Sequence, residues 1–335
     1  MKFYLTVVLL RMLFLGVPTF AQQPTQHAFI WSQKSGMKDL GSLGASSYAQ
    51  AVNASGQVAG YFVTNFGDLH AFLWTVKGGM KDLGTLGGNF SVARGIDDSG
   101  VVVGSASKKS GAVHAVLWTA TGAITDLGTL GGSSSEADGI NKKGDIVGDS
   151  STKGNSATHA FLKIGIRRMR DLGTLGGASS AASAVNVFRA VAGNSTTSAG
   201  DEHAFMWTKA AGMQDLGTLG QSSNAIGIND LEDVVGFSVL TGGSPFHAFL
   251  WTVSGGMQDL GTLGDFGANS DAFESNKSGE IAGYSYTDHT DAIYHAVVWQ
   301  GSTHQISDLG TLGGKNSTSA AINGSGKIVG WSDIN

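Results

Sequence analysis

The chain repeats one seven-residue word, DLGTLGG, at a nearly constant spacing. The word stands at 82–88 and 126–132, and close variants begin at five further aspartates. The seven copies begin at Asp39, Asp82, Asp126, Asp171, Asp215, Asp259 and Asp308, which gives spacings of 43, 44, 45, 44, 44 and 49 residues. A fixed period of about 20 to 50 residues is the sequence signature of a repeat architecture. This word therefore constrains the fold more than any other feature of the chain.

Each repeat contains four short β-rich segments separated by turn residues. In the second unit these segments are predicted at 91–97, 101–105, 114–119 and 123–128. Gly, Ser, Asn or Asp bounds the segments, and these residues indicate hairpins. Four antiparallel strands in about 44 residues are typical of one blade of a β-propeller. The 51 glycines exclude a helical repeat. A β-solenoid is an alternative, although its coils are usually shorter than the period of this chain.

Two patterns favour a closed ring of blades. Small residues recur at two alternating positions of the first segment, as at Ala93 and Gly95, which suits a strand crowded near an axis. The third segment, as at 70–74, is apolar on both faces. Such a run is expected for a strand that neighbouring sheets cover on both sides.

The two ends of the chain complement each other. The first unit begins with a third segment at His27–Trp31, and the last unit ends with a second segment at Lys327–Trp331. A sheet made from both ends would remove the open edges of a ring. We therefore predict an all-β fold, a seven-bladed β-propeller of four-stranded antiparallel blades in which the N- and C-terminal strands share the last blade. A fragment of a longer array is the alternative.

The first 21 residues are interpreted as a secretory signal peptide. Lys2 supplies a positive start, an apolar run at 5–17 is interrupted only by Arg11, and Ala21 is a small residue at the cleavage point. The run is too short and too broken to span a membrane. No later segment reaches 18 apolar residues. We therefore expect a single propeller domain over 22–335 that is secreted or extracellular and has no membrane span, with a periplasm as the alternative location.

Composition narrows the function classes. Removal of Lys2 and Arg11 with the signal peptide takes the formal charge from −5 to −7, and a mildly acidic chain without basic clusters is a poor nucleic-acid binder. The chain has no cysteine, so the fold uses no disulfides. Searches for the nucleophile elbow GxSxG, the zinc motif HExxH, the phosphate loop GxxxxGK[ST] and calcium loops are negative. The sequence predicts no catalytic residue, no metal site and no cofactor.

A second repeated word accompanies the first. HAF or HAV triplets begin at His27, His70, His114, His159, His203, His247 and His295, and a DLGTLGG-type word follows each of them. In these residues the chain resembles the HAF-repeat family of bacterial extracellular repeat proteins over essentially all of 27–332. The resemblance implies export and a repeat fold, and it carries over no reaction or ligand.

The repeated histidines and aspartates could be acid–base groups or parts of the scaffold. A single His/Asp pair would invite a catalytic hypothesis, but seven copies at positions set by the blades favour a structural role. The aspartate can accept hydrogen bonds from the turn that follows it, and the histidine can bridge strands. The predicted structural repeat positions include His70, Asp82, His114, Asp126, His203, Asp215, His247 and Asp259.

The tryptophans close the third segment in six of the seven units and are predicted to pack between blades. The fourth unit has Lys163 instead, followed by a basic run at 167–170. We interpret that run as a solvated outer edge.

The links between second and third segments differ most among the repeats, so function is expected there. Links in three units consist mostly of small polar residues, whereas the others carry aromatic residues that fall in contiguous blades around the ring. Aromatic loop residues can form a platform for sugars or for apolar side chains of another protein. The predicted ligand-binding residues are Tyr61, Phe62, Phe66, Phe246, Tyr286, Asp288, His289, Asp291, Tyr294 and Trp331. Residues next to the second segment, such as Tyr61, Phe237 and Tyr284, could instead pack under the rim.

Three functional classes follow from this reading. We favour a secreted, non-enzymatic binding module that recognises a carbohydrate or protein ligand through the aromatic loops. The alternatives are a structural surface or matrix protein without a discrete ligand, and an extracellular polysaccharide hydrolase or lyase that would depend on Asp288 or Asp291.

Overall fold

The protein is built from β-strands. The computed structural model describes residues 25–264, 267–288 and 293–334, so the predicted signal peptide at 1–21 lies outside the described residues. These residues form 28 strands and one short 3-10 helix, Lys153–Asn155. The all-β class predicted from the sequence is confirmed. Within the described ranges, no helix is long and apolar enough to cross a membrane.

The strands follow one another in antiparallel groups of four. The first three groups are β3 (Ser46–Val52), β4 (Val58–Val63), β5 (Leu69–Thr75) and β6 (Gly79–Asp82); β7 (Gly87–Ile96), β8 (Val102–Lys108), β9 (Val113–Trp118) and β10 (Ile124–Asp126); and β11 (Gly131–Ile140), β12 (Asp145–Thr152), β13 (Thr158–Ile164) and β14 (Arg170–Asp171). The next three are β15 (Gly176–Val185), β16 (Val191–Thr197), β17 (Glu202–Thr208) and β18 (Gly212–Asp215); β19 (Ser222–Ile228), β20 (Val234–Val239), β21 (Phe246–Thr252) and β22 (Gly256–Asp259); and β23 (Ser270–Ser275), β24 (Glu280–Tyr286), β25 (Tyr294–Gln300) and β26 (Gln305–Asp308).

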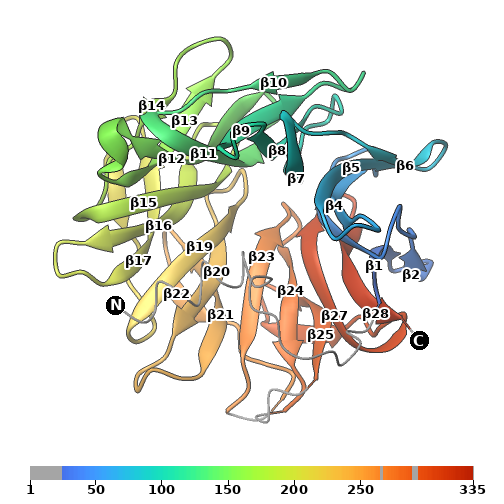
Figure 1. Cartoon of the computed structure of the whole chain (residues 1–335). Helices are drawn as coiled ribbons and strands as arrows, with labels where there is room; N and C mark the ends of the chain where they lie inside the picture. The colour runs from blue at the N-terminus through green and yellow to red at the C-terminus, as the bar shows by residue number, and fades with distance from the viewer. Residues whose placement is uncertain (1–24, 265–266, 289–292, 335) are drawn as a thin grey trace, which may run out of the picture.

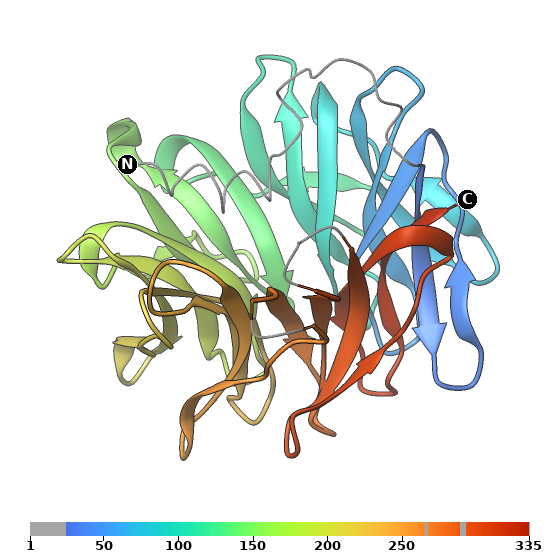
Figure 2. The ribbon, with the colours of Figure 1, turned by 90° about the horizontal axis from the view of Figure 1, so that it is seen from below.

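The remaining strands join the two ends of the chain. β27 (Gly313–Ile322) and β28 (Ile328–Ile334) pair with β1 (Gln26–Ser32) and β2 (Gly36–Asp39) in the order β2-β1-β28-β27. Phe29 of β1 lies opposite Gly330 of β28, and Figure 2 shows the first and last strands side by side. We call these four strands the terminal group. This is the sheet that the sequence predicts from the N- and C-terminal strands together.

The groups are arranged around a common axis (Figure 1). Each first strand contacts the first strand of the next group, and β27 contacts β3. The groups form separate sheets except where one parallel residue pair joins β5 to β7 and another joins β13 to β15, and no sheet closes on itself. This arrangement is that of a β-propeller.

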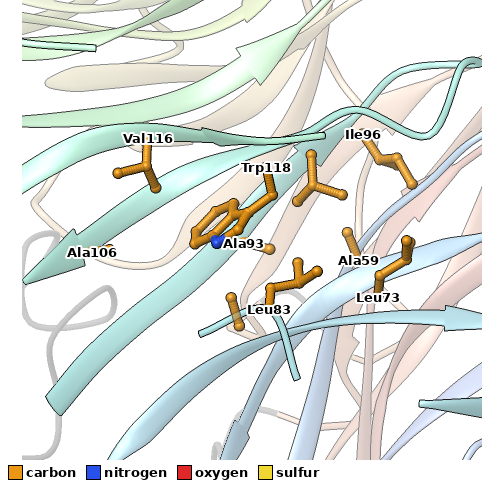
Figure 3. Close-up of a cluster of buried hydrophobic side chains, with 10 residues drawn as sticks. Ala59, Leu73, Leu83, Ala93, Ile96, Ala106, Val116 and Trp118 are labelled. Atoms are coloured by element: carbon orange, nitrogen blue, oxygen red, sulfur yellow. The ribbon is translucent and has the colours of Figure 1, made fainter. Parts of the chain in front are cut away.

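The hydrophobic core lies between neighbouring groups. In one cluster, Trp118 of the second group packs with Ala59 and Leu73 of the first, together with Ala93 and Ile96 (Figure 3). Similar clusters join each group to the next and the terminal group to the first. Burial of apolar surface on both faces of each sheet explains the apolar third segments. Trp74, Trp118, Trp207 and Trp299 are buried as predicted, whereas Trp31 and Trp251 are only half-buried.

One member of the basic run does more than face solvent. The guanidinium of Arg170 lies 4.9 Å from the centre of the Trp207 ring in the next group. This cation–π contact lies in the unit where Lys163 replaces the usual tryptophan. Arg170 is exposed, as the interpretation of 167–170 as a solvated edge predicts, and it makes this contact in addition.

The first strands are longer than the sequence predicts. The second unit was expected to begin its first strand at 91, but β7 begins at Gly87, so the paired glycines of the repeated word enter the strand. The pairing of β7 with β8 shifts between Gly87 and Ser91 and again between Ala93 and Gly95, as in β-bulges. A side chain at Gly88 would meet the carbonyl oxygen of Lys108 at 2.7 Å, which explains why glycine is used there.

A belt of asparagines surrounds the axis at the turns between first and second strands. In Asn53 the Oδ1 atom accepts the backbone N–H of Gln57 and thereby closes the turn, while Nδ2 donates to the carbonyl of Asp97 in the next repeat. The same inter-repeat bond runs from Asn141 to Asn186, Asn186 to Asn229, Asn276 to Asn323 and Asn323 to Asn53. The belt thus links the last repeat to the first.

Candidate functional site

The repeated histidines and aspartates pair with each other. Histidine Nδ1 lies 2.7 to 2.9 Å from an aspartate oxygen in the pairs His27 with Asp39, His70 with Asp82, His114 with Asp126, His159 with Asp171, His203 with Asp215, His247 with Asp259 and His295 with Asp308. An ionised carboxylate only accepts hydrogen bonds, so Nδ1 donates. Each aspartate also accepts the backbone N–H of the glycine two residues later, at 2.6 to 2.9 Å. Each pair therefore ties a third strand to the turn that leaves the fourth.

A buried serine completes this repeated network. In the fourth group, Ser180 Oγ accepts the backbone N–H of Ala160 at 2.9 Å and donates to the carbonyl of Gly173 at 2.6 Å. Equivalent serines accept the corresponding alanine N–H in the other repeats, at 2.8 to 2.9 Å. The serine therefore fastens each group to the preceding one at the same rim as the His/Asp pairs.

Two of the aspartates have pKa values below the ordinary value of the side chain. Burial by itself would raise the pKa of Asp259, but hydrogen bonds from His247 and from the Gly261 amide leave it below its ordinary value. Burial likewise opposes ionisation of Asp126, and the hydrogen bond from Lys108 together with the Gly128 amide lowers its pKa. Both carboxylates are held in the charged form by hydrogen bonds from side chains and turn amides at the same rim.

An aromatic cluster crosses the same rim over three neighbouring groups. Tyr48 stacks on Tyr61 with ring centres 4.8 Å apart, and its edge meets Trp331 at 5.8 Å. Trp331 meets Tyr294 at 6.0 Å. Tyr294 contacts Tyr286 at 5.4 Å and Tyr284 at 5.8 Å, and Tyr284 contacts Phe273 at 5.8 Å. These seven rings form one connected series from the first group through the terminal group to the sixth, and we call them the aromatic cluster.

A polar network borders the cluster. The Tyr48 hydroxyl donates to Gln26 Oε1 at 2.7 Å, and Gln26 Nε2 donates to Asp333 at 3.0 Å. Asn316 donates both its backbone N–H and its side-chain amide to the other oxygen of Asp333. Burial, and next the nearby charge of Asp333, raise the pKa of Tyr294, and burial raises the pKa of Tyr48. The phenols therefore stay protonated and can act as hydrogen-bond donors.

The first strands beside the cluster carry charged side chains that are partly or fully buried. Arg94 forms ion pairs with Glu136 at 3.0 Å and with Asp138 at 3.3 Å. Burial opposes the charge of Arg94, but the two carboxylates raise its pKa. Glu274 accepts the backbone N–H of Ile322 at 2.9 Å, and burial raises the pKa of its carboxyl to about 7.

The structure brings together four of the predicted ligand-binding residues and separates others. Tyr61, Tyr286, Tyr294 and Trp331 belong to the aromatic cluster. Three further aromatic predictions are placed elsewhere.

Phe62 was predicted on the rim but is only 4% exposed and packs in the core between the terminal and first groups, because alternate residues of β4 face opposite sides. Phe66 is 94% exposed at a hairpin tip and has no ring contact with the cluster. Phe246 packs against Phe237 at 5.5 Å, apart from the cluster. The aromatic residues that contact one another thus come from fewer of the predicted links than the sequence suggested. Asp288 is half-buried beyond the end of β24, and His289 and Asp291 lie outside the described residues.

Tyr48 and Phe273 were not among the predicted ligand-binding residues, because both are on first strands rather than in variable links. The signal was nevertheless present. Tyr48 stands one residue after the repeated serine, where other repeats have Val92, Ala181 or Thr318. An aromatic residue at an otherwise variable position of a repeat could have been selected.

The chemistry of this rim suits binding. Partly exposed rings offer apolar faces, and the amides of Gln26 and Asn316 provide hydrogen-bonding groups beside them. In the described part of the chain, no group of three or more metal-ligating side chains could hold a metal ion.

Comparison with known proteins supports the fold class. No protein-family model matches the chain, and no curated protein matches it by sequence. The structure is similar to the β-propeller domain of the trilobed protease from Pyrococcus furiosus, with a TM-score of 0.55 and 10% identity over 83% of this chain and 88% of that chain. It is also similar to a protein described as TolB from Agrobacterium tumefaciens, with a TM-score of 0.52 and 10% identity over 93% and 99% of the two chains.

A third match, TolB from Acinetobacter baumannii, has a TM-score of 0.49 and 12% identity over 69% of this chain. This chain spans 62% of that protein. At such identities the matches to the Pyrococcus furiosus and Agrobacterium tumefaciens proteins show a β-propeller fold and nothing about ligands.

Proposed function

We propose that the chain is an exported, closed seven-bladed β-propeller of the HAF-repeat type that acts as a non-enzymatic binding module. The closed ring is supported by the first strands, which contact one another in sequence until β27 meets β3. The Asn323 to Asn53 bond and the core cluster between the terminal and first groups support it as well.

The single observation that carries the binding role is the aromatic cluster. Its rings occupy positions that differ among the repeats, yet they come together from three groups. A scaffold that needs only inter-blade packing has no use for a connected series of tyrosines at one rim, because the equivalent positions of the second to fourth groups hold Val92, Glu136 and Ala181.

The ligand we favour is an extracellular polysaccharide. Aromatic faces pack against the apolar faces of sugar rings, and the neighbouring amides of Gln26 and Asn316 suit hydroxyl groups. A protein partner is the second candidate, because tyrosine and tryptophan also anchor protein interfaces.

The test is a binding screen of the purified protein against a panel of immobilised polysaccharides. Tyr286→Ala removes one partly exposed ring and is expected to weaken binding about tenfold, since one aromatic contact contributes about 1 kcal/mol. Phe66→Ala is the matched control, because it removes a more exposed ring outside the cluster and should leave binding unchanged. Binding to a protein in place of every polysaccharide would select the second candidate.

Absence of binding to any probe, or binding that Tyr286→Ala leaves intact, would favour a structural matrix protein instead. Turnover of a polysaccharide would overturn the non-enzymatic role.

A further inference from the structure

A second site lies at the opposite end of the strands, between the fifth and sixth groups. A half-open cavity of about 310 Å³ is lined there by the turn after β19, the β21–β22 hairpin, the end of β23 and the loop that follows β25. Turns between first and second strands and between third and fourth strands share one rim of an antiparallel group. The aromatic cluster instead borders the links between second and third strands, so the two sites are at opposite rims.

One residue difference opens this cavity. Ser275 ends the first strand of the sixth group, whereas the equivalent position in the other repeats holds a branched aliphatic residue. Those residues are Val52, Ile96, Ile140, Val185, Ile228 and Ile322. Ser275 is smaller than any of them, so the space that their methyl groups fill elsewhere is left open here.

The asparagine belt is also interrupted at this place. Asn186 and Asn276 each donate to the carbonyl of the next repeat. Asn229 donates its side-chain N–H to Asp233 at 3.0 Å in its own turn, and no bond from it to Asn276 is present among the described residues. The second group, which has Asp97 at this position, makes no such bond to Asn141 among the described residues either. At the same turns Lys277 of the sixth group forms an ion pair with Asp230 of the fifth group at 2.9 Å, and Asn229 and Asp233 form part of the cavity wall.

A buried hydroxyl without a partner lies behind the wall of the cavity. Ser275 is only 7% exposed, and its Oγ has no hydrogen-bond partner in the described part of the chain. Buried hydroxyls are nearly always paired, because an unpaired one costs free energy.

The remaining walls define the chemistry of that ligand. Leu250 and Ile281 supply an apolar surface, while the Asp233 carboxylate and the Gln258 amide supply an acceptor and a second polar group. A volume near 310 Å³ lies at the lower end of the range of about 300 to 1,000 Å³ for small-molecule sites. The fitting ligand is small, has several hydroxyl groups on one side and has C–H groups on the other.

We propose that this inter-blade cavity binds a neutral monosaccharide. A hydroxyl of the sugar donates to Asp233, and its C–H face packs on Leu250 and Ile281. The site is independent of the polysaccharide surface under Proposed function, since no residue is shared between them.

In the experiment, the full-length protein is titrated with D-glucose, D-galactose, D-mannose and N-acetyl-D-glucosamine, and binding is measured by saturation-transfer NMR. Binding of at least one of these sugars is expected. Ser275→Val should weaken that binding at least tenfold, because valine fills the cavity. The variant should fold, since Val52 and Val185 occupy the same position in other repeats. Ile96→Val is the matched control at an equivalent position away from the cavity and should bind as the parent does.

The outcomes separate this proposal from the polysaccharide site. Tyr286→Ala should leave monosaccharide binding unchanged, and a loss with that variant would place the sugar on the aromatic cluster and overturn the proposal. Absence of saturation transfer from all four sugars would also overturn it, as would equal binding by the parent and Ser275→Val.

Discussion

The two sets of side chains at one rim of the propeller differ in how their partners are chosen. The His/Asp pairs join residues 12 or 13 positions apart within one repeat, so every repeat makes the same contact. The aromatic cluster joins rings from three groups, and Tyr48 reaches Trp331 across the ends of the chain. The repeated residues therefore build the scaffold, whereas a site arises where single repeats depart from the pattern.

The sixth group sharpens this contrast. Its first strand departs from the pattern at Phe273, Glu274 and Ser275, which contribute to the aromatic cluster, a buried carboxyl and the inter-blade cavity respectively. If the contrast is right, substitutions at repeated positions lower stability, and substitutions at unrepeated positions change binding or even raise stability.

The largest effect is expected at a glycine of a second strand. Gly60, Gly104, Gly148, Gly193, Gly236, Gly283 and Gly330 each face the bulged first strand so closely that a Cβ atom would overlap its carbonyl oxygen. Gly104→Ala should therefore lower the free energy of unfolding by about 3 kcal/mol or more, as measured by urea denaturation.

Gly324→Ala is the control, because nothing lies within 4 Å of a Cβ atom at that position. Equal stability of the two variants would show that the bulge can relax and that these glycines are not part of the scaffold.

Glu274→Gln is expected to act in the opposite direction and with a pH dependence. Burial raises the pKa of Glu274 from 4.5 to about 7, so the folded protein binds the proton more tightly than the unfolded chain does. Stability from this group is fully present below pH 4.5 and is lost as the pH rises through 7. The glutamine variant should therefore be more stable than the parent by about 2 kcal/mol at pH 8.

The difference should disappear at pH 4, and thermal melts at both values provide the measurement. A variant that is less stable than the parent at pH 8 would contradict the burial of an uncompensated carboxylate.

Ser180→Ala tests the repeated serine. Alanine would leave the N–H of Ala160 and the carbonyl of Gly173 without their buried partner, at a cost of about 2 kcal/mol. Chemical denaturation should show this loss, while binding at the aromatic cluster stays as in the parent. The exposed Ser110→Ala serves as the comparison and should be neutral. Loss of binding without loss of stability in Ser180→Ala would break the division between scaffold and site.

His70→Ala should have the smallest effect. The His70 and Asp82 side chains are partly exposed, at 24% and 41%, and exposed pairs of this kind contribute about 1 kcal/mol or less. The buried His247→Ala should cost more, because its side chain is only 7% exposed. Denaturation of both variants checks the order, and a large change in ligand affinity with either one would assign the pair a role in binding.

Much of the scaffold could be predicted because each repeat contains the same residues at the positions that form it. The period, the hairpin glycines and the apolar third segments indicated four-stranded groups, and the two incomplete ends predicted the terminal group. Predictions failed where a neighbour decided the outcome. Phe62 faces the core because alternate residues of β4 point to opposite sides, and β7 extends to Gly87, where it pairs with β8 across a register shift.

The sequence by itself determined the repeated contacts of this protein, since their partners are always the same short distance apart along the chain. Only the tertiary structure decided which unrepeated residues meet. Tyr48 and Trp331 are separated by most of the chain, and Ser275 of the sixth group lines a cavity together with Leu250 of the fifth. Such contacts depend on how whole groups pack around the axis, and no local pattern of residues encodes that.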